Sequence, residues 1–295
     1  MPQHDNRTIA IAGAGRVAQA IGKALQDAGV NIDFLAHRNP ENARAAAEFI
    51  GGGIVPISYN DLVSSASHVL IAVSDSAIEP LSKQLALPGG AIRVALHTCG
   101  SYGPELLESL SATGVSCGSI HPLQTISDGA QGAVALHNAA FAVSGAPEAM
   151  GWAKEIVSVL EGQILYIKPE ARHLYHAAAV MSSNYIAVIL DAALELMGIA
   201  GVPKEAALHA LAPLARTSLE NALHSGPVAA LTGPIVRGDA STVAAHVLAL
   251  EQVEPSARQL YRVAGLRALR MARERGLSEE DVTKVRRALM GENKS

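Results

Sequence analysis

Aromatic residues and cysteines are scarce in this chain. Phe, Trp and Tyr make up only 3% of its 295 residues, although hydrophobic residues make up 49%. This composition predicts a core of Ala, Val, Leu and Ile between closely packed helices, and it argues against disorder. The only two cysteines, Cys99 and Cys117, show no metal-ligand spacing with each other or with a His pair, which argues against a disulfide framework and structural zinc. We therefore expect no metal and a cytoplasmic protein.

The chain also lacks an excess of positive charge and a long apolar run. Its 23 Lys and Arg against 27 Asp and Glu give a formal charge of −4, so there is no basic field to attract nucleic acid. The longest uncharged helical run, 177–190, falls short of the ~20 residues that span a bilayer. We interpret it as a buried helix. Residues 1–8 are polar and lack the apolar core of a signal peptide. A small molecule is the expected partner, without nucleic acid or membrane.

Short β-rich runs alternate with helix-length segments from residue 8 onward. This alternation predicts an α/β fold, a Rossmann-type doubly wound parallel sheet with helices on both faces. Two further short strands are expected at 141–143 and 163–166, with a helix over 148–160 between them. The first five strands are expected at 8–12, 30–36, 68–73, 92–97 and 116–120.

The β signal stops after Lys168-Pro169, and the rest of the chain has a helical pattern punctuated by Gly and Pro. The length exceeds that of one usual compact domain. We predict a Rossmann domain over 1–167 and an all-α domain for substrate binding and dimerisation over 168–295.

A glycine-rich turn follows the first predicted strand and opens a helix. In such a turn the first Gly permits the tight bend, the second lets the backbone approach a pyrophosphate, and a small third residue lets helix and strand pack closely. The helix N-terminus then faces the phosphate charge. The predicted dinucleotide site is Gly13-Ala14-Gly15-Arg16-Val17-Ala18.

The end of the second predicted strand indicates which dinucleotide binds. NAD sites usually place Asp or Glu there, whereas this chain has His37-Arg38-Asn39. A guanidinium suits the 2′-phosphate of NADP, so His37 and Arg38 favour NADP; otherwise Arg38 is an ordinary loop cation. Ser74 and Asp75 follow the next sheet strand and are expected along the cofactor, although Asp75 could instead cap a helix beginning near Ile78.

These motifs, together with several later ones, resemble a bacterial family of Rossmann-like proteins with a C-terminal helical domain of unknown function. The resemblance covers nearly the whole chain. It extends to the group that includes ketopantoate reductase, pyrroline-carboxylate reductase, 6-phosphogluconate dehydrogenase and prephenate dehydrogenase. It implies a Rossmann domain followed by an all-α domain that often dimerises, and it does not imply a substrate. The later motifs are His97-Thr98-Cys99-Gly100, His121-Pro122-Leu123-Gln124, Tyr175-His176-Ala177-Ala178-Ala179, Ser183-Asn184-Tyr185 and Thr232-Gly233-Pro234-Ile235-Val236-Arg237-Gly238-Asp239.

The predicted helix that starts near Glu170 carries a polar stripe. Arg172, His176 and Ser183 lie within roughly 40° of one another at 100° per residue, and Asn184 lies at the edge of the same face. Aligned with ketopantoate reductase, His176 falls at the position of that enzyme's catalytic Lys and Asn184 on an Asn. Histidine could protonate the oxygen that gains charge during hydride transfer. We therefore predict catalytic roles for His176 and Asn184 and substrate binding by Ser183, with a core histidine as the alternative for His176.

His121-Pro122 follows a predicted strand end and is similar to the His-Pro pair of prephenate dehydrogenases, whose His contacts the substrate hydroxyl. Strand ends line the cleft of such sheets. The alternative is a structural histidine that braces the loop. Ser101 and Thr98 could donate to substrate or cofactor, and we count Ser101 among the catalytic candidates. Cys99 is interpreted as a small buried filler rather than a nucleophile.

Arg237 lies on a Gly- and Pro-rich loop between predicted helices and could hold a substrate carboxylate bidentately. Asp239 could equally cap the following helix. The leading hypothesis is an NADP(H)-dependent oxidoreductase acting on a small oxo, hydroxy or imino acid, with a homodimer formed through the helical domain. The alternatives are a prephenate-like dehydrogenase and a non-catalytic NADP-binding sensor or scaffold.

Overall fold

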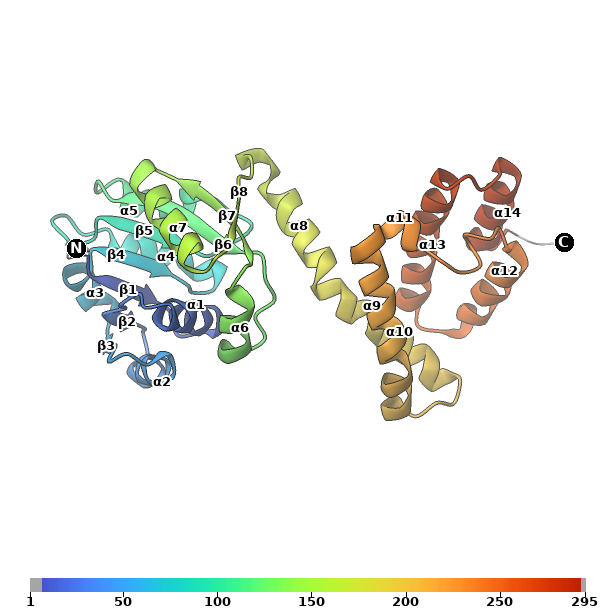
Figure 1. Ribbon diagram of the computed structural model, residues 1–295, viewed down its shortest axis with the longest axis horizontal. Helices are drawn as coiled ribbons and strands as arrows, with labels where there is room; N and C mark the ends of the chain where they lie inside the picture. Colours follow the sequence, from blue (N-terminus) through green and yellow to red (C-terminus); the bar gives the residue numbers. More distant parts are fainter. Residues whose placement is uncertain (1–6, 293–295) are drawn as a thin grey trace. The chain divides into compact units, whose positions relative to one another are not determined.

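A computed structural model describes residues 7–292 of the chain (Figure 1). The chain divides into two compact units between Ser183 and Asn184. The first unit contains the sheet, its covering helices and one further helix after residue 167. The second unit is entirely helical.

One eight-stranded sheet organises the first unit, in the order β3-β2-β1-β4-β5-β6-β7-β8. This order, with neighbours on both sides of β1 and helical crossovers between strands, is that of a doubly wound Rossmann-like sheet and confirms the predicted fold class. The strands are β1 Ile9–Ala12, β2 Phe34–Ala36, β3 Val55–Ile57, β4 His68–Ile71, β5 Val94–His97, β6 Ser116–Pro122, β7 Ala140–Gly145 and β8 Gln163–Leu165.

Two features of the sheet differ from the sequence prediction. The edge strand β3 was not predicted, because its three residues include Pro56 and proline is uncommon within strands. The pair β6 and β7 is antiparallel, while the other neighbouring strands are parallel, so the prediction of a wholly parallel sheet is wrong at this edge. The alternation of strands and helices along the sequence does not reveal this exception, because the relative direction of two strands depends on how they pair in the sheet.

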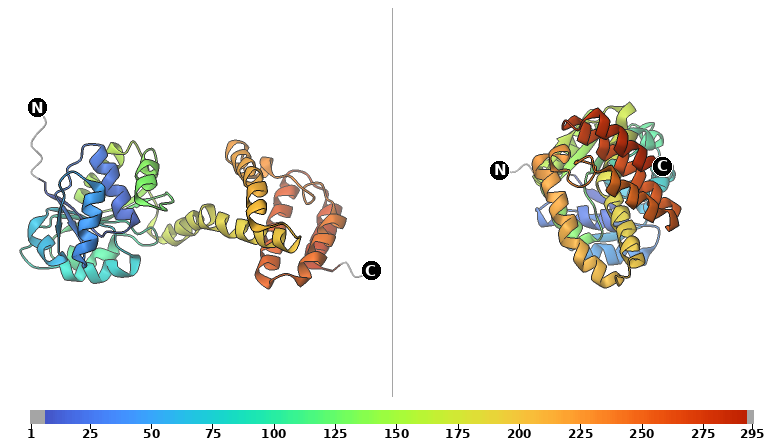
Figure 2. Two further views of the ribbon diagram at one scale, coloured as in Figure 1. Left: turned by 90° about the horizontal axis from the view of Figure 1, so that it is seen from below. Right: turned by 90° about the vertical axis from the view of Figure 1, so that its right-hand side faces the viewer.

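Helices cover both faces of the sheet (Figures 1 and 2). Alternate residues of a strand point to opposite faces, so Ile9 and Ile11 join one core while Ala10 and Ala12 join the other. Both faces are apolar, as expected of a buried sheet. The helices of this unit are α1 Arg16–Asp27, α2 Pro40–Ile50, α3 Tyr59–Ser65, α4 Asp75–Leu85, α5 Glu108–Ser111, α6 Gly129–Leu136, α7 Pro147–Val159 and α8 Arg172–Ser182, with short 3₁₀ turns at Pro104–Leu107 and Pro169–Ala171.

The second unit has its core between its last three long helices, around Val243, Leu269 and Val285. The preceding helices contribute little to it, since none of the residues of α9 is buried and only Ala207 of α10 is. The helices are α9 Asn184–Ile199, α10 Lys204–Ser225, α11 Pro227–Ala230, α12 Ala240–Ala249, α13 Pro255–Glu274 and α14 Glu279–Met290, with a 3₁₀ turn at Leu250–Gln252.

The prediction of one buried helix over 177–190 is wrong. The helix is interrupted at Ser183, which divides this run between α8 and α9. Val188 and Ile189 on α9 are 51% and 55% exposed. The run is apolar, but its own unit covers only about half of each of these side chains.

Candidate functional site

The glycine-rich turn joins β1 to α1 and packs against β4. Gly13 has φ +131°, and a Cβ there would lie 2.2 Å from the carbonyl oxygen of Ala72, so only glycine fits. The Gly13 N–H donates to the Ala36 carbonyl at 2.9 Å, which fixes the turn against β2 as well. The turn is therefore held tightly between the two strands that neighbour β1.

The next glycine leaves the start of α1 open. Gly15 is the N-cap residue, no side chain caps the helix, and its first turn contains no acidic residue. A Cβ on Gly15 would meet no protein atom within 4 Å. Free N–H groups, a positive helix end and room for close approach are what a pyrophosphate requires. The turn thus fits the diphosphate of a dinucleotide.

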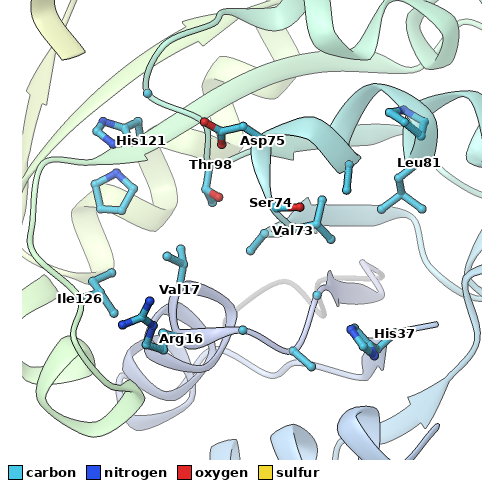
Figure 3. Close-up of a pocket in the computed structure, with 18 of the residues that line it drawn as sticks. Arg16, Val17, His37, Val73, Ser74, Asp75, Leu81, Thr98, His121 and Ile126 are labelled. Atoms are coloured by element: carbon cyan, nitrogen blue, oxygen red, sulfur yellow. The ribbon is translucent and has the colours of Figure 1, made fainter. Parts of the chain in front are cut away.

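A pocket of about 770 Å³ runs past this turn. Figure 3 shows His121, Asp75 and Thr98 toward one end and His37 and Leu81 toward the other. Nine of the ten predicted cofactor residues line it, together with His121 and His176, while the tenth, Ala18, is fully buried. The lining residues are Gly13, Ala14, Gly15, Arg16, Val17, His37, Arg38, Tyr59, Ala72, Val73, Ser74, Asp75, Ala77, Pro80, Leu81, Gln84, Thr98, Gly100, His121, Pro122, Gln124, Ile126 and His176.

The Arg38 side chain is exposed at the end of the pocket where β2 finishes. Within the described residues, 7–292, no carboxylate forms an ion pair with it. Asn39 caps α2 by accepting from the N–H groups of Glu41 and Asn42, so it serves the fold. The guanidinium lies close enough to Tyr59 to oppose the rise in pKa that burial gives this phenol. Arg38 is thus available to an anionic ligand beside an aromatic ring.

One of the two interpretations of Asp75, that it caps a helix beginning near Ile78, is wrong. Helix α4 begins at Asp75 itself, after Ser74, whose hydroxyl makes no capping bond. The Asp75 side chain points toward Thr98 and His121 (Figure 3). Both residues line the pocket, and Asp75 places a negative charge near its histidine end.

His121 lies near the end of β6. Its Nδ1 is 2.7 Å from the Tyr175 hydroxyl oxygen on α8. Burial, and then the proximity of His176, lowers the pKa of His121 to about 4, while the Asp75 carboxylate acts in the opposite direction. His121 is therefore a neutral imidazole at pH 7. A Cβ on Gly100 would lie 2.7 Å from His121 Nε2, so the absence of a side chain there makes room for the ring.

His176 faces the pocket from α8. Its Nδ1 is 3.0 Å from the Ser101 hydroxyl oxygen, and its ring centroid is 6.0 Å from that of His121. Ser101 does not line the pocket, but it contacts His176, which does. The structure thus brings together three of the four predicted catalytic residues, which come from β6, from α8 and from the loop after β5.

His97, which received no role from the sequence, braces that loop. It is fully buried, its Nε2–H donates to the Gly103 carbonyl at 2.7 Å, and its Nδ1 accepts from the Cys99 N–H at 3.2 Å. Burial lowers the pKa of His97 to about 4. This neutral bridge closes the loop that carries Gly100 and Ser101. Cys99 is buried with a raised pKa, in keeping with its interpretation as a filler rather than a nucleophile.

The polar stripe predicted on the helix after residue 170 does not form one continuous face. Arg172 is 4% exposed, and its guanidinium donates to the Tyr102 carbonyl and to the hydroxyls of Ser119 and Ser144. It therefore fixes the first turn of α8 to β6 and β7. Only His176 of the stripe faces the pocket. The Ser183 hydroxyl donates to the Ala179 carbonyl one turn back.

Two predicted site residues lie in the second unit, Asn184 at the start of α9 and Arg237 on the loop before α12. Their roles in substrate handling, like that of Ser183, stay predictions. Asp239 caps α12, since its carboxylate accepts from the Thr242 N–H at 3.0 Å and from the hydroxyls of Ser241 and Thr242. These hydrogen bonds lower its pKa to about 2.

Two tyrosines at this site, Tyr59 and Tyr175, were not predicted from the sequence. Tyr59 follows β3, the strand that was not predicted. Tyr175 precedes His176, and adjacent residues of a helix point 100° apart, so the predicted stripe did not include it. The signal that could have found Tyr175 was the length of its side chain, because a phenol reaches further from a helix than an imidazole does.

Comparison with known proteins shows what the chain is similar to. Residues 8–96 match the family described as NADP oxidoreductase, coenzyme F420-dependent. These residues are thus similar to an NADP oxidoreductase domain. The match confirms the predicted cofactor. Residues 139–268 match a domain of unknown function, DUF2520, and no curated protein matches the chain.

Several solved structures share the fold over most of their length. A protein from Bacteroides fragilis described as an NADP oxidoreductase is 24% identical, with a TM-score of 0.72, and the match covers 90% of this chain and 98% of that one. Pyrroline carboxylate reductase from Plasmodium falciparum, solved with NADP, is 13% identical, with a TM-score of 0.58 and coverage of 95% and 99%. A reductive aminase from Aspergillus terreus, solved with NADPH4, cyclohexanone and allyl amine, is 18% identical, with a TM-score of 0.57 and coverage of 96% and 92%.

Proposed function

We propose that the chain is an NADP(H)-dependent oxidoreductase that interconverts a small oxo or imino acid and its reduced form. One observation carries the proposal. A single pocket joins the glycine turn and Arg38, which suit a phosphorylated dinucleotide, to His121 near the carboxyl end of β6 and His176 on α8. When bound, NADPH supplies the hydride for a carbonyl or imine carbon.

The two histidines suit different tasks. His121 is neutral at pH 7, so it can donate a hydrogen bond to the substrate without adding a charge. A neutral neighbour also leaves His176 free of like-charge repulsion when His176 is protonated. We assign His176 as the group that gives a proton to the oxygen or nitrogen of the substrate while the adjacent carbon is reduced. Ser101 positions the ring of His176 through its hydroxyl.

The test of this function is a screen of oxo and imino acids, with prephenate and NADP included for the reverse direction, that follows the consumption or formation of NADPH by absorbance. Turnover of an oxo or imino acid supports the proposal. Turnover of prephenate would identify a prephenate-like dehydrogenase instead. Tight binding of NADPH without its consumption by any compound would favour the sensor hypothesis and contradict the proposal.

Arg38 should decide the preference between the two nicotinamide cofactors. NADPH is expected to raise the melting temperature more than NADH, because ligand binding stabilises the folded state by mass action. Arg38→Asp should weaken NADPH binding about 10–100-fold, as expected for loss of a charge-assisted contact of ~1.5–3 kcal/mol, and leave NADH favoured. Arg44→Asp is the matched control, because Arg44 is exposed on α2 and does not line the pocket. Equal shifts for both cofactors in the unmodified protein would contradict this prediction.

We also propose a homodimer through the helical half of the chain. Helices α9 and α10 expose nine large apolar side chains, and an exposed apolar surface often marks a site of association. In the described part of the chain, the segment Pro169–Ile199 is by length and composition apolar enough to cross a membrane. Arg172, Tyr175 and His176 in that segment bond to the sheet and its loops, which favours a protein partner. The exposed side chains are Tyr185, Ile186, Val188, Ile189, Ile199, Leu208, Leu214, Leu219 and Leu223.

Light scattering at micromolar concentration should report twice the mass of one chain. Ile189→Lys should shift the protein toward the monomer, because a charge would be buried in an apolar symmetric interface. Val134→Lys is the control, since Val134 is 75% exposed on α6 in the sheet-containing unit. A monomeric unmodified protein would refute the dimer.

A further inference from the structure

The Tyr175 hydroxyl stands behind the His121 ring and does not line the pocket. It lies 2.7 Å from Nδ1, with the two rings perpendicular and their centroids 5.6 Å apart. The guanidinium of Arg172, one turn earlier on α8, fixes that end of the helix to β6 and β7. The hydroxyl is therefore held at one particular nitrogen of the imidazole.

The direction of this hydrogen bond follows from the proton inventory of the two groups. A neutral imidazole has one N–H and one acceptor nitrogen, and a phenol has a single proton to donate. Burial raises the pKa of Tyr175 to about 12, so the phenol keeps its proton. Among the described residues, none other than His121 accepts from this hydroxyl. Donation to Nδ1 satisfies the phenol, whereas the reverse direction would leave its proton without an acceptor in a half-buried place.

A hydrogen bond at one imidazole nitrogen decides which tautomer is present. With Nδ1 accepting from Tyr175, the ring proton of His121 is on Nε2. That nitrogen packs against Gly100, whose missing side chain makes room for the ring, and no described residue hydrogen-bonds to it. Because His121 lines the pocket, its ring can offer a ligand an N–H without a charge.

We propose that Tyr175 is a positioning residue that holds His121 as the neutral Nε2–H tautomer, so that His121 selects a hydrogen-bond acceptor on the ligand. What this inference implies about the class of substrate rests on the proposed function. An unprotonated carbonyl, carboxylate or imine acceptor is bound at His121, and a protonated amine is not.

The tautomer itself can be measured without any turnover. Long-range ¹H–¹⁵N correlation NMR on the full chain, labelled with ¹⁵N-histidine, distinguishes a protonated from an unprotonated ring nitrogen, and the spectrum of His121→Asn assigns the signals. We expect Nε2–H and bare Nδ1 for His121 in the unmodified protein at pH 7.5. In Tyr175→Phe the Nδ1–H form should become populated, because Nδ1 loses its donor.

Tyr102→Phe is the matched control. Tyr102 also packs edge-on against a histidine of α8, His173, but its hydroxyl has no described partner, so this variant should keep the tautomer of the unmodified protein. An Nδ1–H tautomer in the unmodified protein would overturn the proposal, and so would an unchanged tautomer in folded Tyr175→Phe. If the substrate screen finds no turnover, the NMR result still stands, so the failure of the two proposals is distinguishable. With a substrate in hand, Tyr175→Phe should lower kcat/KM about 10-fold and leave the NADPH Kd unchanged.

Discussion

His176→Ala should lower kcat and kcat/KM together by ~10²–10⁴-fold, the usual loss when a general acid is removed. The ring lines the pocket, 6.0 Å from that of His121, and Ser101 fixes its orientation. The affinity for NADPH should hardly change, because the glycine turn and Arg38 lie on other elements. Steady-state rates with the substrate found by screening, together with a titration of NADPH, check both parts.

Two further variants make this result interpretable. His173→Ala removes an exposed histidine of the same helix that does not line the pocket, and it should retain activity. His121→Ala removes the proposed hydrogen-bond donor, and a larger loss there than in His176→Ala would transfer the proton-donating role to His121. A purely structural His176 would give a lower melting temperature with kcat intact per folded molecule. Near-normal kcat in soluble His176→Ala would refute the assignment.

The cofactor half of the site could be predicted because its determinants are local in sequence. Gly13, Gly15 and Arg38 belong to one strand–helix–strand unit, and each has a backbone or charge requirement that residue type alone reveals. The strand ends after β4 and β6 were likewise visible as β-rich runs followed by polar residues. Position at the carboxyl end of a strand is enough to place His121 in the pocket.

The other half depends on contacts between distant segments. Whether His121 meets Tyr175, and Ser101 meets His176, depends on where α8 docks, and Arg172 decides this through hydroxyls on β6 and β7. A helical projection gives the direction of each Cβ but neither the reach of a side chain nor the point where a helix breaks. For this reason the predicted polar stripe extended through Ser183 and did not include Tyr175.

The glycine turn offers a pair of substitutions with opposite consequences for fold and ligand. Gly15 has φ −78°, which alanine adopts without strain, and its Cβ would meet no protein atom within 4 Å. Gly15→Ala should therefore keep the melting temperature of the cofactor-free protein. The added methyl group occupies the side of the turn where a pyrophosphate approaches, so the NADPH Kd should rise about 10–100-fold, or ~1.4–2.7 kcal/mol.

Gly13→Ala is the counterpart, because its Cβ would lie 2.2 Å from the Ala72 carbonyl oxygen at a φ of +131°. Strain of this kind costs about 1–3 kcal/mol before the clash is counted, so the cofactor-free protein itself should melt several degrees lower. Calorimetric titration with NADPH and thermal unfolding without it, on the same preparations, separate the two effects. Because Gly15→Ala leaves the fold alone, unchanged NADPH binding in that variant would show that the dinucleotide does not approach the backbone at this turn.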